Sequence, residues 1–167
     1  MNILGSHNYI NDNRNNHIKI YINGELFARN DAVISVFDSG FLLGDGVWES
    51  IRLMNGNLVF LDEHLDRLYY GANKLSINIK YNRNELSNFI YYTLNANSMH
   101  SDVHIRLIVS RGLKKTPYQH PNANIGGCTI VIIPEYKKPN EQLQVNGLRL
   151  VTVKTRRGTP DSLDPRL

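Results

Sequence analysis

The sequence predicts an α+β domain in which a small antiparallel sheet carries two helices on one side. Three observations indicate this class. Two Asn-Gly pairs, at 23–24 and 55–56, each stand between short segments of strand-like residues, a pattern typical of β-hairpins. Two stretches with apolar residues at helical spacing follow, and strand-like segments then resume. Strands first, then helices, then strands again favour an antiparallel sheet with its helices on one face.

The first 36 residues predict an arm, a hairpin and a short extended piece. Residues 1–16 are rich in asparagine and lack periodicity, so we expect a loose N-terminal arm. Residues 17–22 and 25–28 are expected to pair across the first Asn-Gly turn. Residues 32–36 form another short apolar run, which predicts a further extended segment.

The second hairpin begins with a glycine pair around an aspartate at 44–46, which opens into a segment of alternating residues. The Asn-Gly turn at 55–56 then reverses the chain into a second strand at 58–61. Because successive side chains point to opposite faces of a strand, the first segment divides into two sets. One face carries Val47, Glu49 and Ile51, and the other carries Trp48, Ser50 and Arg52.

Two amphipathic helices are predicted next, over 62–75 and 84–97. Asp62 is a residue type that caps helix N-termini, so we expect the first helix to begin there. The apolar stripe of the first helix consists of Leu65, Leu68, Tyr69, Ala72 and Leu75. That of the second helix consists of Leu86, Phe89, Ile90, Thr93 and Leu94.

Residues 102–110 alternate strictly, which predicts a strand with His104, Arg106, Ile108 and Ser110 on one face. Residues 111–127 contain prolines and glycines and predict a long loop. The apolar run at 128–133 is consistent with a central strand. Residues 17–135 therefore form the expected small domain. The prolines and charges that follow predict a linker at 136–146, and residues 147–167 would begin a second domain with a strand at 148–155.

Composition narrows the class of protein. A chain of 167 residues with 41% hydrophobic and 20% charged residues is typical of a soluble globular protein. The formal net charge of +4 is dispersed, which disfavours nucleic-acid binding, and no apolar run is long enough to cross a membrane. Cys128 is the only cysteine, so no intrachain disulfide can form. The N-terminus lacks the pattern of a signal peptide, and we expect a cytoplasmic protein without a metal site.

Three strings together resemble the class IV (fold-type IV) pyridoxal-phosphate-dependent aminotransferases. They are Gly-Asp-Gly-Val-Trp-Glu-Ser-Ile-Arg at 44–52, Asn-Gly at 55–56 and Glu-His-Leu-Asp-Arg-Leu at 63–68. This family includes branched-chain and D-amino-acid aminotransferases, aminodeoxychorismate lyases and R-selective amine transaminases. The resemblance covers about 18–167. It implies a small α+β domain, a linker and the start of a pseudobarrel domain. It also implies pyridoxal 5′-phosphate as cofactor, an amino acid and a 2-oxo acid as substrates, and a homodimer.

The resemblance also implies roles for individual residues. Arg67 matches the family arginine that contacts the cofactor phosphate. The alternative is a surface arginine that pairs with Glu63. Trp48 matches an aromatic position that lines the substrate pocket, and Arg52 matches a basic position close to it. The alternative for Trp48 is core packing. Arg106 matches a family arginine that helps to recognise acidic substrates, and His104 stands where the family commonly has an aromatic hydroxyl. Both are therefore expected to bind substrate. The alternative for that pair is a structural ion pair.

The chain departs from the family pattern in two places. The Arg-x-His sequence of D-amino-acid enzymes is replaced by Thr116 and Tyr118, which argues against a D-amino-acid specialist. The lysine that bonds the cofactor is expected just beyond Leu167, and Lys154 is more simply an exposed strand residue. The chain would then be a branched-chain-aminotransferase-like enzyme fragment that is inactive alone. The alternatives are a non-catalytic dimerising fragment, an aminodeoxychorismate lyase, or an amine or D-amino-acid transaminase.

Overall fold

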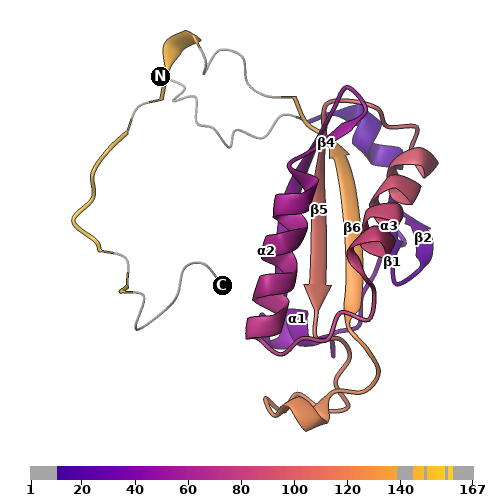
Figure 1. Ribbon diagram of the computed structural model, residues 1–167, viewed down its shortest axis with the longest axis vertical. Helices are drawn as coiled ribbons and strands as arrows, with labels where there is room; N and C mark the ends of the chain where they lie inside the picture. The colour runs from indigo at the N-terminus through magenta and orange to yellow at the C-terminus, as the bar shows by residue number, and fades with distance from the viewer. Residues whose placement is uncertain (1–10, 139–144, 149, 157, 160–167) are drawn as a thin grey trace.

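A six-stranded antiparallel sheet forms the centre of the molecule, in the order β2-β1-β6-β5-β3-β4 (Figure 1). The computed structural model describes residues 11–138, 145–148, 150–156 and 158–159. The strands are β1 (Lys19–Ile22), β2 (Glu25–Ala28), β3 (Gly46–Met54), β4 (Asn57–Val59), β5 (Val103–Ser110) and β6 (Thr129–Tyr136). The α-helices are α1 (Ser39–Leu43), α2 (Leu61–Lys74) and α3 (Arg83–Ala96), with 3-10 turns η1 (Asn13–His17) and η2 (Pro121–Ala123). The predicted α+β class is confirmed.

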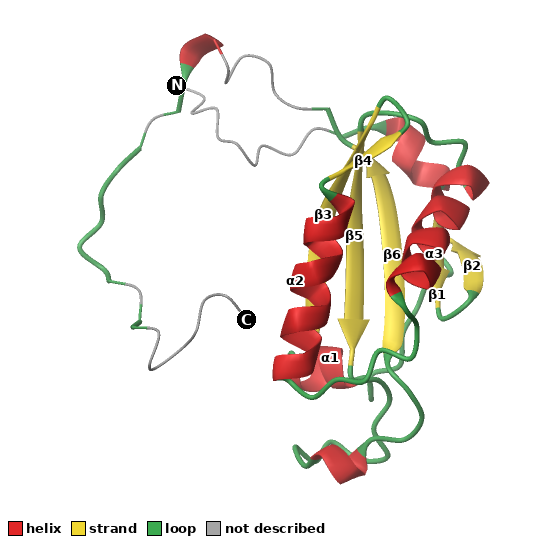
Figure 2. Cartoon of the chain, viewed as in Figure 1, coloured by secondary structure: helices red, strands yellow, loops and turns green. Residues whose placement is uncertain are grey.

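The two long helices lie side by side on one face of the sheet, α2 over β3 and α3 over β1 and β6 (Figure 2). Alternate residues of the strands point toward them and are almost fully buried. This core joins the apolar stripes of both helices, and its centre includes Ile51, Leu68, Ile90, Ile105 and Ile132. The other set of strand residues faces away from both helices. We call this second side of the sheet the open face.

Both helices match their expected ranges to within one residue at each end, but the expected cap of α2 is wrong. Phe60 holds the N-cap position with a φ of 54° and makes no side-chain cap, while Asp62 lies inside the first turn. There its carboxylate interacts favourably with the helix dipole without capping it. Helix α3 has a full capping box, in which Asn82 and Glu85 each bond the other's backbone N–H. No helix in the described part of the chain is long and apolar enough to cross a membrane.

The described part of the predicted N-terminal arm is ordered against the sheet. Residues Asn13–His17 form η1, and the Asn15 side chain bonds both the N–H and the C=O of Tyr136. The guanidinium of Arg14 lies 3.9 Å from the centre of the Tyr136 ring. An asparagine side chain carries both an N–H donor group and a carbonyl acceptor, so it can complete the hydrogen bonding of a strand end as another strand would. Residues 1–10 lie outside the described residues.

Two extended segments expected from the sequence are not strands. Residues 32–36 form turns and irregular backbone, and the short helix α1 follows them unexpectedly. In the segment expected as a strand at 148–155, the described residues are irregular and exposed. A strand needs a neighbour to satisfy its backbone hydrogen bonds, and this segment has none in the described structure. The linker at 136–146 lies partly outside the described residues, so the domain division remains a prediction.

Candidate functional site

The four residues predicted to bind substrate lie together on the open face. Register between β3 and β5 places Arg52 opposite His104, and Ser50 opposite Arg106. Trp48 lies two residues before Ser50 on β3 and therefore on the same face of the sheet. The alternation read from the sequence is therefore sufficient to gather these side chains, because both strands are paired in register along their full common length.

Their contacts differ from those of a structural ion pair. The Ser50 hydroxyl is hydrogen-bonded to His104 Nε2, and the Arg106 guanidinium lies 4.1 Å from the centre of the Trp48 ring. Arg52 donates to the backbone carbonyl of Lys137. Trp48 is 56% exposed, so packing in the core is not its role here. The ion-pair alternative for His104 and Arg106 finds no support among the described contacts.

Two hollows divide the open face by polarity. The larger, of about 500 Å³, lies between the sheet and the segment that contains α1, and its apolar lining includes Ile34, Phe41, Trp48, Ile108 and Val131. The smaller, of about 440 Å³, is lined by Arg29, His104, Arg106, Glu135 and Lys137. Ile20 and Ile133 border both hollows. Three cations face one carboxylate in the smaller hollow, so it favours an anion.

His104 is held neutral in this surrounding. Burial lowers the pKa of His104 from its ordinary 6.5, and the positive charges of Lys137, Arg106 and Arg52 lower it further. Glu135 acts in the opposite direction but is outweighed. At neutral pH the imidazole therefore takes part as a hydrogen-bonding group and adds no charge to the smaller hollow.

This shift predicts a pH dependence of stability. As the pH falls below about 6.5, the unfolded chain binds a proton at His104 that the folded chain resists, so the free energy of unfolding decreases. The limiting slope for one group is about 1.4 kcal/mol per pH unit. Urea unfolding at a series of pH values should show a decrease no steeper than this limit for the one group, and His104→Gln should reduce the decrease. The same change at the exposed His100 is the control, and an equal reduction there would contradict the assignment.

Arg67 lies on the opposite side of the sheet from the four open-face residues. Its Nε donates to Glu49 Oε1 at 2.7 Å and its Nη2 donates to Glu49 Oε2 at 2.5 Å. Nδ1 of His64 donates to the same Oε2 at 2.7 Å. Arg67 thus pairs with Glu49 across 18 positions of sequence, and the alternative partner Glu63 is wrong. Glu49 was placed on its strand face by alternation, but its contact with α2 was not foreseen.

Glu49 is a buried anion with two partners. Its side chain is 2% exposed, whereas that of Arg67 is 64% exposed. Burial by itself raises the pKa of the Glu49 carboxyl, but hydrogen bonds from Arg67 and His64 outweigh it, and the pKa is lowered overall. The carboxylate therefore stays charged at neutral pH, and the guanidinium reaches from it into solvent.

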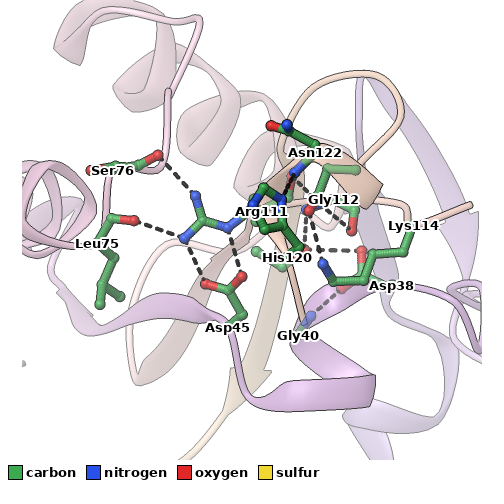
Figure 3. A network of polar contacts seen from close by, with 12 residues as sticks. Asp38, Gly40, Asp45, Leu75, Ser76, Arg111, Gly112, Lys114, His120 and Asn122 are labelled. Carbon is green, nitrogen blue, oxygen red and sulfur yellow. Dashed lines mark hydrogen bonds and ion pairs between the residues drawn. The ribbon is translucent and has the colours of Figure 1, made fainter. Parts of the chain in front are cut away.

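A second polar network holds the turn that leads into β3 (Figure 3). The guanidinium of Arg111 donates to both carboxylate oxygens of Asp45 and to the carbonyls of Leu75 and Ser76 at the end of α2. The chain around 44–46 is thereby tied to the end of β5 and to α2. No role was predicted for Asp45 or Arg111. The Arg-Gly pair directly after a strand was the sequence signal that could have indicated one.

Beside this network, Asp38 and Lys114 are buried charged residues near the start of α1. Asp38 accepts from the Gly40 N–H and from the Ser110 hydroxyl. The Lys114 ammonium donates to Asn124 Oδ1 at 2.9 Å and so bridges the base of the loop between β5 and β6. Together these contacts fix the ends of that loop against the segment that contains α1.

Comparison with known proteins decides the family. The family model described as Amino-transferase class IV matches residues 46–167. The chain belongs to the class IV aminotransferase family. Branched-chain-amino-acid aminotransferase-like protein 1 of Arabidopsis thaliana is 39% identical over 147 residues, which cover 88% of this chain and 26% of that protein. D-alanine aminotransferase of Staphylococcus aureus is 30% identical over 135 residues, which cover 81% of this chain and 47% of the relative.

A solved structure agrees with this assignment. The branched-chain aminotransferase from Thermoproteus uzoniensis, crystallised with norvaline, matches with a TM-score of 0.70 and 25% identity. The match covers 88% of this chain and 49% of that one. This chain therefore spans about a quarter to a half of the length of these class IV aminotransferases.

Class IV aminotransferases use pyridoxal phosphate, and its phosphate group needs hydrogen-bond donors of the kind that a guanidinium offers. Glu49 takes Nε–H and one Nη2–H of Arg67, so the Nη1 hydrogens and the second Nη2 hydrogen have no partner in the described structure. These form the end of the guanidinium fork, which matches two phosphate oxygens. Lys154 is exposed and borders neither open-face hollow. Tyr118 is 71% exposed on the loop beyond the end of the sheet.

Proposed function

We propose that this chain supplies the small-domain part of an aminotransferase site that moves an amino group between an amino acid and a 2-oxo acid. The observation that carries the proposal is the free, exposed end of the Arg67 guanidinium. A buried carboxylate holds the other side of this group, so its outward N–H groups are directed at solvent in one arrangement. Such a fixed fork suits a phosphate, and Arg67 would hold that of pyridoxal 5′-phosphate.

Arg67 and the open-face residues can serve one site at the edge of β3. Strand β4 pairs only with Arg52–Met54, so among the described residues the part of β3 before Arg52 has no strand neighbour on that side. Tyr69 on α2 bonds the backbone of Tyr81 near the start of α3. Helical spacing then places His64 and Arg67 on the other flank of α2, toward this open edge. A ligand at the edge would meet Arg67 from one face and Trp48 from the other.

The open face suits a substrate with an apolar side chain and an anionic group. Trp48 would cover the apolar part beside the larger hollow, while Arg106, His104 and Arg52 would orient carboxylate oxygens beside the smaller one. This division by polarity favours branched-chain amino acids and their 2-oxo acids. The neutral His104 replaces an aromatic hydroxyl with another uncharged hydrogen-bonding group and keeps the balance of charge there positive.

Bound pyridoxal phosphate supplies an electron sink for the carbanion that forms when a proton leaves the substrate α-carbon. The described residues would bind and orient the cofactor and the substrate. The lysine for the covalent bond and the groups for the pyridine nitrogen are expected in the large domain. A homodimer in which small domains complete neighbouring sites belongs to the same proposal.

Amino transfer by the complete product of the gene tests the proposal. We expect transfer from L-leucine, L-valine or L-isoleucine to 2-oxoglutarate, followed through the glutamate formed. Exclusive use of D-alanine would show that the protein is a D-amino-acid aminotransferase. Release of pyruvate from aminodeoxychorismate would show that it is a lyase. Absence of all three activities, together with a stable dimer in sedimentation, would favour the alternative of a non-catalytic dimerising fragment. The 167-residue chain alone, reduced with borohydride after addition of the cofactor, should show no adduct at a unique lysine.

A further inference from the structure

We propose that Glu49 is a positioning residue for Arg67, and that His64 holds Glu49 in the orientation this requires. The inference rests on the proposed function, because it assigns the residues that direct the Arg67 guanidinium toward the cofactor phosphate. Neither Glu49 nor His64 needs to touch the phosphate in this arrangement.

The contact between Glu49 and Arg67 is arranged to leave a phosphate-binding group free. A guanidinium has a side that presents Nε–H and Nη2–H, and an end that presents Nη1–H and Nη2–H. Glu49 occupies the side with two hydrogen bonds of 2.7 and 2.5 Å. The end points away from the carboxylate and is unpaired in the described structure. An arginine without such a contact loses considerable rotamer freedom when it binds an anion, so prior fixation favours binding.

His64 completes the arrangement from α2. It precedes Arg67 by one helical turn, so both residues reach the same carboxylate. Since a carboxylate only accepts hydrogen bonds, Nδ1 of His64 carries the proton in the bond to Oε2. Oε1 accepts from Arg67 alone, and Oε2 accepts from both residues. The two oxygens are thereby distinguished, and the carboxylate is held against rotation.

Two effects of Glu49 on a bound phosphate oppose each other. Its negative charge repels the phosphate, while its hydrogen bonds direct the guanidinium. The charge effect is weakened because Glu49 is already paired with Arg67 and the phosphate would lie at the solvent side. Removing the charge of Glu49 therefore separates the two effects. Weaker phosphate binding shows that positioning dominates, and stronger binding shows that repulsion dominates.

The test uses the 167-residue chain labelled with ¹⁵N, and pyridoxine 5′-phosphate as the probe. This probe has the phosphate of the cofactor but no aldehyde, so it cannot bond lysines. The Nε–Hε signal of Arg67, identified by its loss in Arg67→Lys, reports the guanidinium directly. We expect it to shift with pyridoxine 5′-phosphate and to remain unchanged with pyridoxine. Failure of the wild-type signal to respond would overturn the phosphate role of Arg67 and the inference with it.

Glu49→Gln keeps the shape of the side chain and removes its charge. We expect the Arg67 signal to move toward that of a solvated arginine and the affinity for pyridoxine 5′-phosphate to fall about tenfold, which corresponds to about 1.4 kcal/mol. If the wild type responds but Glu49→Gln binds the probe equally or more tightly, the phosphate role stands and the positioning role is wrong.

A pair of His64 variants keeps the inference testable if Glu49→Gln does not fold. Asparagine carries an amide N–H close to the position of Nδ1, whereas leucine carries no donor. We expect His64→Leu to weaken probe binding and His64→Asn to restore most of it, with both chains equally resistant to urea. Equal probe binding by the two variants would contradict the role of His64. If the role of His64 were purely structural, the two variants would differ in stability but would bind pyridoxine 5′-phosphate with equal affinity.

Discussion

Replacing Gly112 by alanine is expected to lower the free energy of unfolding by about 3 kcal/mol or more. Two physical causes add at this position. The backbone of Gly112 has a φ of 98°, which an L-residue adopts only with strain. A Cβ atom there would also lie 2.0 Å from the carbonyl oxygen of Gly127, which is backbone and has no side-chain torsion to turn aside.

The loop between β5 and β6 would have to open at its base to relieve this contact. Gly112 follows Arg111, whose contacts tie β5 to Asp45 and α2, so the displacement would reach the turn before β3. We therefore expect loss of the Arg111–Asp45 contact together with the loss of stability. Both should appear in urea unfolding curves and in the Nε–Hε signal of Arg111.

Gly126→Ala is the matched control. Gly126 also has a positive φ, of 86°, but beyond its two neighbours no atom in the described part of the chain lies within 4 Å of the position of its Cβ. Only backbone strain remains, which costs about 1 kcal/mol. Equal losses in the two variants would show that strain alone acts at Gly112 and that the close approach to Gly127 is unimportant.

The second large effect is expected at Arg67. In the complete gene product, Arg67→Lys should weaken binding of pyridoxal 5′-phosphate about 100-fold, or by about 3 kcal/mol. Lysine keeps the charge and can still pair with Glu49. It has one ammonium group in place of a planar fork, so it cannot offer one pair of parallel N–H groups to the buried carboxylate and a second pair to a phosphate. Cofactor absorbance during dialysis against decreasing cofactor concentrations measures the affinity.

Arg83→Lys provides the control for general effects of replacing an arginine. Arg83 is also an exposed helical arginine that pairs with a carboxylate, in this case that of Asp66. Exposed pairs of this kind contribute about 0–1 kcal/mol, so stability and cofactor affinity should both stay close to the wild type. If Arg67→Lys bound the cofactor as tightly as Arg83→Lys does, Arg67 would not be the phosphate residue.

Helices α2 and α3 could be placed from the sequence because their signal is local and repeated. Four or five core residues at helical spacing define each helix and the face that it buries. The N-cap of α2 could not be placed in this way. Phe60 adopts a positive φ because the chain must turn from β4 into the helix, and no residue type at that position indicates it.

Part of the candidate site could likewise be predicted from the sequence, and part could not. Alternation along two strands was enough to bring Trp48, Arg52, His104 and Arg106 to one face, because strand periodicity fixes the face of every residue once one is known. The same rule placed Glu49 on the opposite face. It could not show that His64 and Arg67 would meet Glu49, because that contact depends on the position and rotation of α2 on the sheet.

The sequence alone determined the fold class, the faces of the strands, the two long helices and the likeness to class IV aminotransferases. Periodicity or short sequence motifs indicate each of these features, and reading them requires no knowledge of contacts between distant residues. The tertiary structure alone decided the partners of the charged groups: Glu49 for Arg67, Trp48 for Arg106 and Asp45 for Arg111. A contact between side chains of separate elements depends on the relative positions of those elements. Packing determines these positions, and many residues contribute to the packing at once.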